Sequence, residues 1–138
     1  MSDLARTWLQ DTYPVRSLEL PKGGRGPSNA DDIVAGLRSR IDRDERAAYI
    51  ATFDHYAHTQ SLPDGEIADE IEDAKNVIFC VGRRLPMALA PALRPRSIGV
   101  VELPDRFVVS FMESPMPLAN ELMTQWLHEL AEEAEPAS

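Results

Sequence analysis

The amino-acid sequence predicts an α+β fold, in which a single-layer antiparallel or mixed β-sheet of about five strands packs against two main helices. Two observations support this prediction: short β-rich runs recur along the chain, and two longer segments repeat their apolar residues at helical spacing. The predicted order is β-α-β-(α)-β-(α)-β-β-α, and 138 residues suffice for one domain. We therefore divide the chain into an N-terminal arm (1–14), a single α+β domain (15–131) and an acidic tail (132–138).

The first strand is predicted over residues 15–20, where V-R-S-L-E-L alternates apolar and polar side chains until PKGGRGP interrupts the pattern. Residues 1–14 lack this alternation and end in Tyr13-Pro14. We therefore expect a loosely held arm there, with a helical turn around Trp8 as its one regular element.

The first long helix is predicted to begin after Ser28 or Asn29, because both residue types are favoured N-caps. Acidic residues in its first turn suit the positive end of the helix dipole. Its buried stripe consists of Ile33, Val34, Leu37 and Ile41.

A second strand is predicted over residues 47–53, with Tyr49, Ala51 and Phe53 on one face. The strand delivers Asp54 and His55 at its carboxyl end. With a period of two, His55 continues the core-facing side and Asp54 faces the opposite way. We therefore expect the His55 side chain to point into a concavity lined by residues 82–96.

The middle of the chain is predicted to contain one central strand between two short connecting elements. Residues 62–65 have turn chemistry, and residues 66–75 fit either a short helix or an ordered loop. Residues 76–81 are apolar on both parities, which is typical of a strand covered on both faces, and Gly82 ends the run. Residues 86–93 can form a short helix bounded by prolines.

The C-terminal part is predicted to form a hairpin followed by the second long helix. The β-rich runs 97–103 and 106–112 are separated by Pro104-Asp105, which favours a tight turn. A helical stripe then begins at Leu118 and frays into the acidic AEEAEPAS sequence; its members are Leu118, Leu122, Met123, Trp126, Leu127 and Leu130.

Composition excludes several classes of partner. The net charge of -9 repels nucleic acid and anionic lipid, and no segment approaches the length of a membrane span. Cys80 is the only cysteine and no signal-peptide pattern opens the chain, so we expect a reducing compartment, the cytoplasm. The charge is uneven, because residues 74–101 contain no acidic residue but five basic ones.

Taken in order, these elements resemble the domain-of-unknown-function family 302 over about residues 30–120. The resemblance rests on FDH at the end of the second strand, on NVIFCVG closing in Gly82, on PMALAPAL, and on the pair SIGVVEL and FVVSFMESP. It implies a β-α-β-β-β-β-α type of fold and frequent self-association, without an established activity. After Gly82 the family commonly continues with Asn-Pro, whereas this chain has Arg83-Arg84-Leu85-Pro86.

His55 is the first candidate site residue, since a strand end is where a scaffold presents chemistry and imidazole acts as acid, base or ligand. Its partner is either Asp54 or, as the strand parity favours, one of Tyr56, Thr59, Glu66 and a backbone carbonyl. His58 follows in a loop. The structural alternative is a histidine whose ring nitrogens bond backbone carbonyls.

The second candidate is a group of arginines, because guanidinium forks recognise carboxylate and phosphate. Arg83 and Arg84 follow the central strand, and Arg94 and Arg96 precede its expected neighbour, so all four should gather at one end of the sheet. The alternative is that they form weak surface ion pairs with carboxylates such as Asp54, Glu66, Glu102 or Glu113.

No metal or cofactor is predicted. Zinc would need a third ligand beside His55 and His58 from Cys80 or Glu66, without supporting motif spacing. Cys80 is expected to be buried and inert, and the glycines of PKGGRGPS match neither a P-loop nor a dinucleotide fingerprint.

Two functional hypotheses follow. The first is a cytoplasmic domain without demonstrable catalysis that self-associates as a homodimer and presents one polar pocket. The second is a small enzyme or sensor in which His55, oriented by Asp54, acts on a carboxylate or phosphate ligand held by the arginines.

Overall fold

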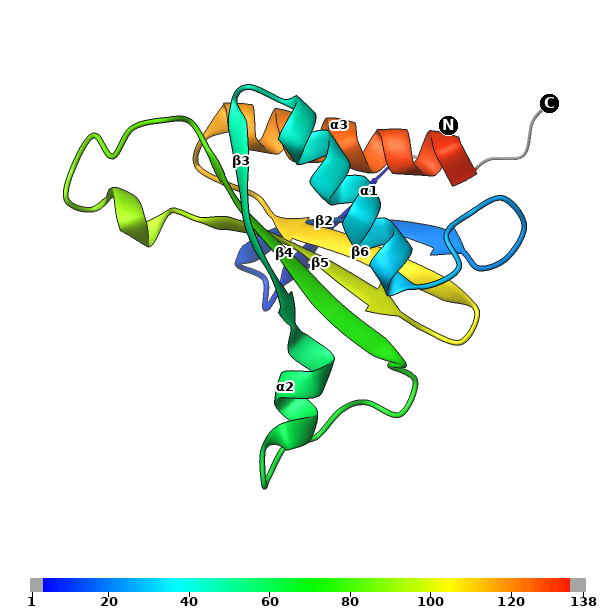
Figure 1. Cartoon of the computed structure of the whole chain (residues 1–138). Coiled ribbons are helices and arrows are strands. Elements are labelled where there is room, and N and C mark those ends of the chain that lie inside the picture. Colours follow the sequence, from blue (N-terminus) through cyan, green and yellow to red (C-terminus); the bar gives the residue numbers. More distant parts are fainter. Residues whose placement is uncertain (1–3, 135–138) are drawn as a thin grey trace.

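The computed structural model describes residues 4–134, which form one six-stranded sheet with the order β1-β2-β6-β5-β4-β3 (Figure 1). All neighbouring strands are antiparallel. The strands are β1 (Ala5–Leu9), β2 (Tyr13–Pro21), β3 (Ala47–Asp54), β4 (Asp73–Val81), β5 (Arg96–Glu102) and β6 (Arg106–Met112). The predicted α+β class is confirmed, with six strands in place of about five.

Two long helices, α1 (Ala30–Arg43) and α3 (Pro117–Ala134), cover the same face of the sheet (Figure 1). Asn29 is the N-cap of α1, and its side chain accepts the backbone N–H of Asp32 at 2.9 Å. The sequence alone did not decide between Ser28 and Asn29 as the N-cap. Helix α3 extends to Ala134, into the stretch predicted as an acidic tail, and residues 135–138 lie outside the described part.

The core lies between these helices and the sheet. Trp126 of α3 is 2% exposed and meets Phe79 of β4 edge-on, with ring centroids 5.4 Å apart. The predicted stripes of both helices supply the helical side of the core with Ile33, Leu37, Ile41, Leu122, Met123, Leu127 and Leu130. Local periodicity therefore identified the buried helix faces correctly.

The other face of the sheet is not covered by a long helix (Figure 1). Ile78 and Cys80 of β4 lie on this face and are half-buried, whereas their neighbours Val77, Phe79 and Val81 are buried against the helices. The expectation that the strand is covered on both faces, with a fully buried Cys80, is therefore wrong. Apolar residues at both odd and even positions of a strand can also occur where one face of the sheet is only partly covered.

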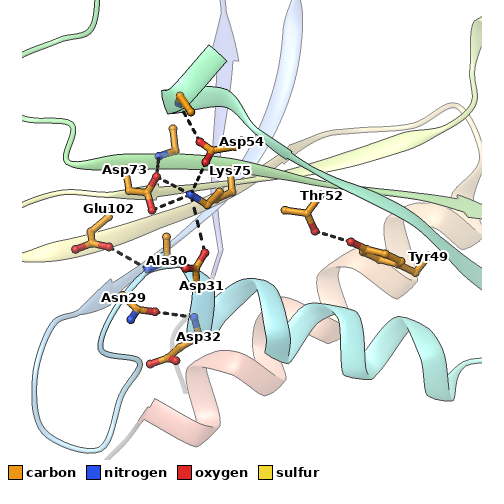
Figure 2. Close-up of polar contacts among 12 residues, drawn as sticks. Asn29, Ala30, Asp31, Asp32, Tyr49, Thr52, Asp54, Asp73, Lys75 and Glu102 are labelled. Carbon is orange, nitrogen blue, oxygen red and sulfur yellow. Dashed lines mark hydrogen bonds and ion pairs between the residues drawn. The ribbon is translucent and has the colours of Figure 1, made fainter. Parts of the chain in front are cut away.

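Strand β3 contains a bulge at Ile50, which changes the predicted assignment of its faces. Tyr49 pairs with Phe79 and Ala51 with Ile78, so one extra residue is inserted between them. After the bulge, Thr52 returns to the helix face, where its hydroxyl lies 2.7 Å from the Tyr49 hydroxyl (Figure 2). Phe53 is exposed as a result, and the prediction that Tyr49, Ala51 and Phe53 share the core face is wrong.

Directly after β3 the chain forms a short helix, α2 (His55–Ser61), on the side of the sheet away from α1 and α3 (Figure 1). The sequence had predicted a loop around His58. Residues 66–72 form a loop rather than a helix, and β4 begins three residues earlier than predicted. The predicted short helix over 86–93 is reduced to a 3₁₀ turn, Ala90–Ala92.

The N-terminal residues add an edge strand to the sheet. Strand β1 pairs with β2 through Thr7 and Val15, and all five of its residues are exposed. The expected helical turn around Trp8 is therefore wrong, because Trp8 lies in an extended hairpin. Among residues 4–134, no helix is long and apolar enough to cross a membrane.

Candidate functional site

Asp54 and Lys75 belong to a charged network on the helix face of the sheet (Figure 2). The Lys75 Nζ lies 3.0 Å from Asp73 Oδ1, 3.2 Å from Asp54 Oδ2 and 3.9 Å from Asp31 Oδ1 of α1. Burial by itself pulls the pKa of Lys75 down, but its hydrogen bonds to Asp73 and Asp54 outweigh this effect, so the pKa is raised. The network ties β3, β4 and the start of α1 together.

Asp54 also caps α2, which gives its carboxylate a role other than orienting His55. One of its oxygens accepts the backbone N–H of Ala57 at 2.9 Å. This hydrogen bond, followed by the contact with Lys75, holds the pKa of Asp54 below its usual range. Because the helix begins immediately after Asp54, the carboxylate turns toward the helix N-terminus and Lys75 rather than toward the imidazole.

The partner of His55 is Asn76, on the open face of the sheet. The His55 Nδ1 lies 2.9 Å from Asn76 Oδ1, and the Asn76 amide nitrogen donates to Ser97 Oγ at 3.0 Å. In the orientation in which the amide nitrogen donates to Ser97, the Asn76 oxygen faces the ring and accepts from a proton on His55 Nδ1. The Nε2 atom is then left as the acceptor, which suits a base or a metal ligand.

His55 and His58 both contact the ring of Phe53, with centroid separations of 5.1 and 5.3 Å. Both histidines are exposed. Thr59 is half-buried within α2, and its carbonyl accepts the N–H of Leu62 at 3.2 Å, whereas Glu66 is exposed in the following loop. Within residues 4–134, no three His, Cys, Asp or Glu side chains are grouped to hold a metal ion.

The structure places the arginines at the opposite end of β4 from His55. Asp54 pairs with Lys75 near the start of β4, whereas Arg83 and Arg84 follow its last residue. At about 3.3 Å per residue, Asn76 and Gly82 are roughly 20 Å apart along the strand. The expected concavity, lined by both His55 and residues 82–96, is therefore wrong, because the strand separates the two groups.

Arg83 and Arg84 lie in the exposed loop after β4. Gly82 ends the strand as predicted, with a φ of 88° that only glycine adopts readily. Arg83 donates to the carbonyl of Glu45 at 3.0 Å, and the carbonyl of Arg84 accepts a hydrogen bond from Arg94. Arg84 thus contacts Arg94 through its backbone carbonyl.

Arg94 and Arg96 line a cavity of about 110 Å³ between this loop, β5 and the start of α3. The Arg96 Nη2 donates to the carbonyl of Met112 at 2.7 Å, while its Nε is buried without a hydrogen-bond partner. Burial lowers the pKa of Arg96. The other residues lining the cavity are Val81, Pro86, Met87, Ala90, Leu93, Ser114, Met116 and Ala119.

None of the four arginines forms an ion pair within residues 4–134. The alternative of surface pairs with Asp54, Glu66, Glu102 or Glu113 therefore finds no support there. Instead Glu113 pairs with Arg6 and Arg16, and Glu102 with Lys22. The cavity thus holds positive charge without a neighbouring carboxylate in its wall.

The chain matches a protein family in sequence and a solved structure in fold. The sequence profile of a family of unknown function, DUF6858, matches residues 4–132. The chain belongs to this family. No curated protein matches the chain. This DUF6858 member is similar to the crystal structure of an uncharacterized conserved protein DUF302 from Bacillus stearothermophilus, with 11% identity and a TM-score of 0.54.

That alignment covers 88% of the DUF6858 chain and 98% of the DUF302 chain. At this level of identity the likeness concerns the fold, and it confirms the resemblance to family 302 drawn from the sequence. It includes more than the predicted residues 30–120, because 88% of the chain is covered.

Sequence reasoning missed two groups of residues in this DUF6858 member. Asn76 and Ser97 each lie 21 residues from their hydrogen-bond partner, so no local spacing reveals the chain that they form with His55. The cavity wall combines the end of β4, the 86–93 loop and the start of α3. The available signal was the basic, acid-free segment 74–101, which contains Arg94 and Arg96 of the cavity wall.

Proposed function

We propose that this chain is a non-catalytic binding domain whose ligand is a small organic anion held in the cavity of Arg94 and Arg96. The main evidence is that two arginines without carboxylate partners line a cavity that is otherwise largely apolar. A carboxylate accepts two parallel hydrogen bonds from a guanidinium, which makes arginine the natural receptor for it.

The environment of Arg96 supports this proposal. A buried donor without an acceptor costs about 1–3 kcal/mol, and more when it is charged. The Met112 and Leu93 carbonyls hold the Arg96 guanidinium, and its Nε–H has no acceptor within residues 4–134. A bound anion would supply the missing negative charge.

His55 has no role in this proposed site. It contacts Asn76 on the open face of the sheet, whereas Arg96 pairs with Phe79 on the helix face, roughly 10 Å further along β4, so the sheet separates the imidazole from a ligand in the cavity. We therefore favour binding over acid-base catalysis. Its fixed hydrogen bond to Asn76 then serves to hold α2 against the sheet.

We expect millimolar propionate, added to a chloride buffer, to raise the melting temperature of the wild-type chain. At ten times the dissociation constant the stabilisation is about 1.4 kcal/mol, or roughly 3–6 °C for a chain of this size. Arg96→Met should abolish this shift, and the measurement is differential scanning fluorimetry.

Arg83→Met is the matched control, because Arg83 lies in the same loop but does not line the cavity. It should keep the full shift. The absence of a shift in wild type with all of propionate, butyrate, succinate and phosphate would refute anion binding at this site.

We also propose that the chain forms a homodimer through the free edge of β1. Trp8, Leu9 and Tyr13 are 51%, 51% and 49% exposed, an unusual group of large apolar side chains on one hairpin. The opposite edge strand, β3, carries a bulge, a device that discourages edge-to-edge pairing. β1 has no such protection beyond the charge of Arg6.

The chemistry of β1 suits antiparallel pairing with a second copy. A two-fold axis at Thr7 would place Arg6 of one copy opposite Trp8 of the other and Ala5 opposite Leu9. Arg6 already lies 4.7 Å from the ring centroid of its own Trp8, so the contact needs little rearrangement.

The single cysteine, Cys80, is free, which agrees with a cytoplasmic location.

Light scattering at about 100 µM protein should give the mass of a dimer for wild type and of a monomer for Thr7→Glu, because Thr7 lies on the axis and two carboxylates would then face each other. Leu85→Glu is the control, since Leu85 is exposed but distant in sequence from the hairpin. It should remain dimeric. A monomeric wild type at this concentration would contradict the proposal.

A further inference from the structure

The walls of the arginine cavity restrict which anions it can hold, and this inference rests on the proposed function. Apart from the two guanidinium groups, the wall is formed by aliphatic, proline and methionine side chains and by Ser114. The charged end of a ligand is therefore recognised at the arginines, and the remainder meets apolar surface. A second charged group would lie against that surface without a partner, which is costly.

Ser114 adds one donor beside the arginines. Its hydroxyl oxygen accepts the N–H of Met116 at 3.0 Å, and its backbone groups exchange hydrogen bonds with the Asn120 side chain. These contacts fix the residue and leave the hydroxyl proton free to donate. The polar part of the wall thus offers N–H and O–H donors and no carboxylate, which suits an anionic oxygen.

The volume sets the size of the ligand. An apolar cavity of roughly 150 Å³ holds benzene, which has six non-hydrogen atoms. A cavity of about 110 Å³ therefore accommodates about five or six.

We infer that the ligand is a free aliphatic monocarboxylate with a short unbranched tail, of about three or four carbons in total. Its carboxylate binds Arg94, Arg96 and the Ser114 hydroxyl, and its tail contacts Met87, Leu93 and Met116. Met87 belongs to the exposed loop over the cavity, so its side chain limits the length of the tail.

Dissociation constants from NMR titration of the wild-type chain with formate, acetate, propionate, butyrate, hexanoate and octanoate test this inference. The affinity should rise about fourfold with each added methylene up to butyrate and then fall. Butyramide, which has the same shape without the charge, should bind at least tenfold more weakly. Succinate and phosphate should also bind at least tenfold more weakly than butyrate.

Met87→Ala should move the optimum to a tail longer by one or two carbons, whereas Leu89→Ala, in the same loop but outside the cavity wall, should leave it unchanged. Both side chains are largely exposed, at 60% and 71%, so both variants should fold. Equal binding of succinate or phosphate, or an affinity independent of chain length, would refute the inference that the ligand is a monocarboxylate. The proposal that the cavity binds an anion would remain. No binding of any anion would instead refute the proposed function itself.

Discussion

Replacing Trp126 by alanine should lower the free energy of unfolding by about 3–5 kcal/mol, the usual range for removing a buried tryptophan. Trp126 is almost completely buried and its ring meets that of Phe79 edge-on, so the variant loses both apolar burial and an aromatic contact. The neighbouring core comes from helices and strands that cannot collapse into the space. Denaturant unfolding followed by circular dichroism measures the change.

Because a domain of this size is stable by only about 5–15 kcal/mol, the alanine variant can fail to fold. Trp126→Phe then serves as the second variant, with an expected loss of about 1–3 kcal/mol. Leu85→Ala is the control, since Leu85 is 72% exposed and its removal should change stability by less than about 0.5 kcal/mol. Equal losses for the core and control variants would contradict the described packing.

Replacing Lys75 by methionine should destabilise the fold by about 1–2 kcal/mol near neutral pH. The ammonium group lies within 3.9 Å of three aspartates, and without it their carboxylates repel one another beside the start of α1. Methionine keeps most of the aliphatic stem, so the loss reports mainly on charge.

This loss should depend on pH in a defined way. The pKa of Asp54 is lowered by folding, so its contribution is present above about pH 4 and disappears as the pH falls through the folded-state value. The pKa of Lys75 is raised, so its contribution is present below about pH 10 and disappears at higher pH. The difference between wild type and Lys75→Met should therefore be largest between about pH 5 and pH 9.

Urea unfolding at several pH values provides the measurement. Arg106→Met is a suitable control, because its contacts with Asp105 and Glu19 involve exposed groups and should contribute little to stability. A loss in Lys75→Met that is the same at pH 3 and pH 7 would show that packing of the side chain, and not its charge, is responsible.

The sequence was most informative where local rules determine the structure. The helical stripes, the choice of N-cap to within one residue, the Pro104-Asp105 turn and the strand-ending Gly82 all depend on neighbours within a few positions. The position of the arginines at one end of the sheet was also predictable. They lie in the connection between β4 and β5, which are neighbouring antiparallel strands.

The parts that failed depend on distant neighbours. A single inserted residue at Ile50 reverses every later side chain of β3, and nothing in the local pattern marks it. The reversal moved Phe53 to the open face, and the His55 partner could not be predicted because Asn76 belongs to the adjacent strand. The cavity required knowledge of how α3 begins relative to the 86–93 loop.

The strand order has a consequence for how the chain is completed during synthesis. β2 joins the sheet through β6, with Val15 opposite Met112, so the β1-β2 hairpin has no place in the sheet until β6 has been made. Leu18 and Leu20, buried in the finished fold, stay without their partner strand during that interval. Such distant pairing slows folding and leaves apolar surface open to aggregation or to chaperones on the ribosome. A segment that precedes the rest of the sheet in the sequence is thus among the last to be incorporated into it.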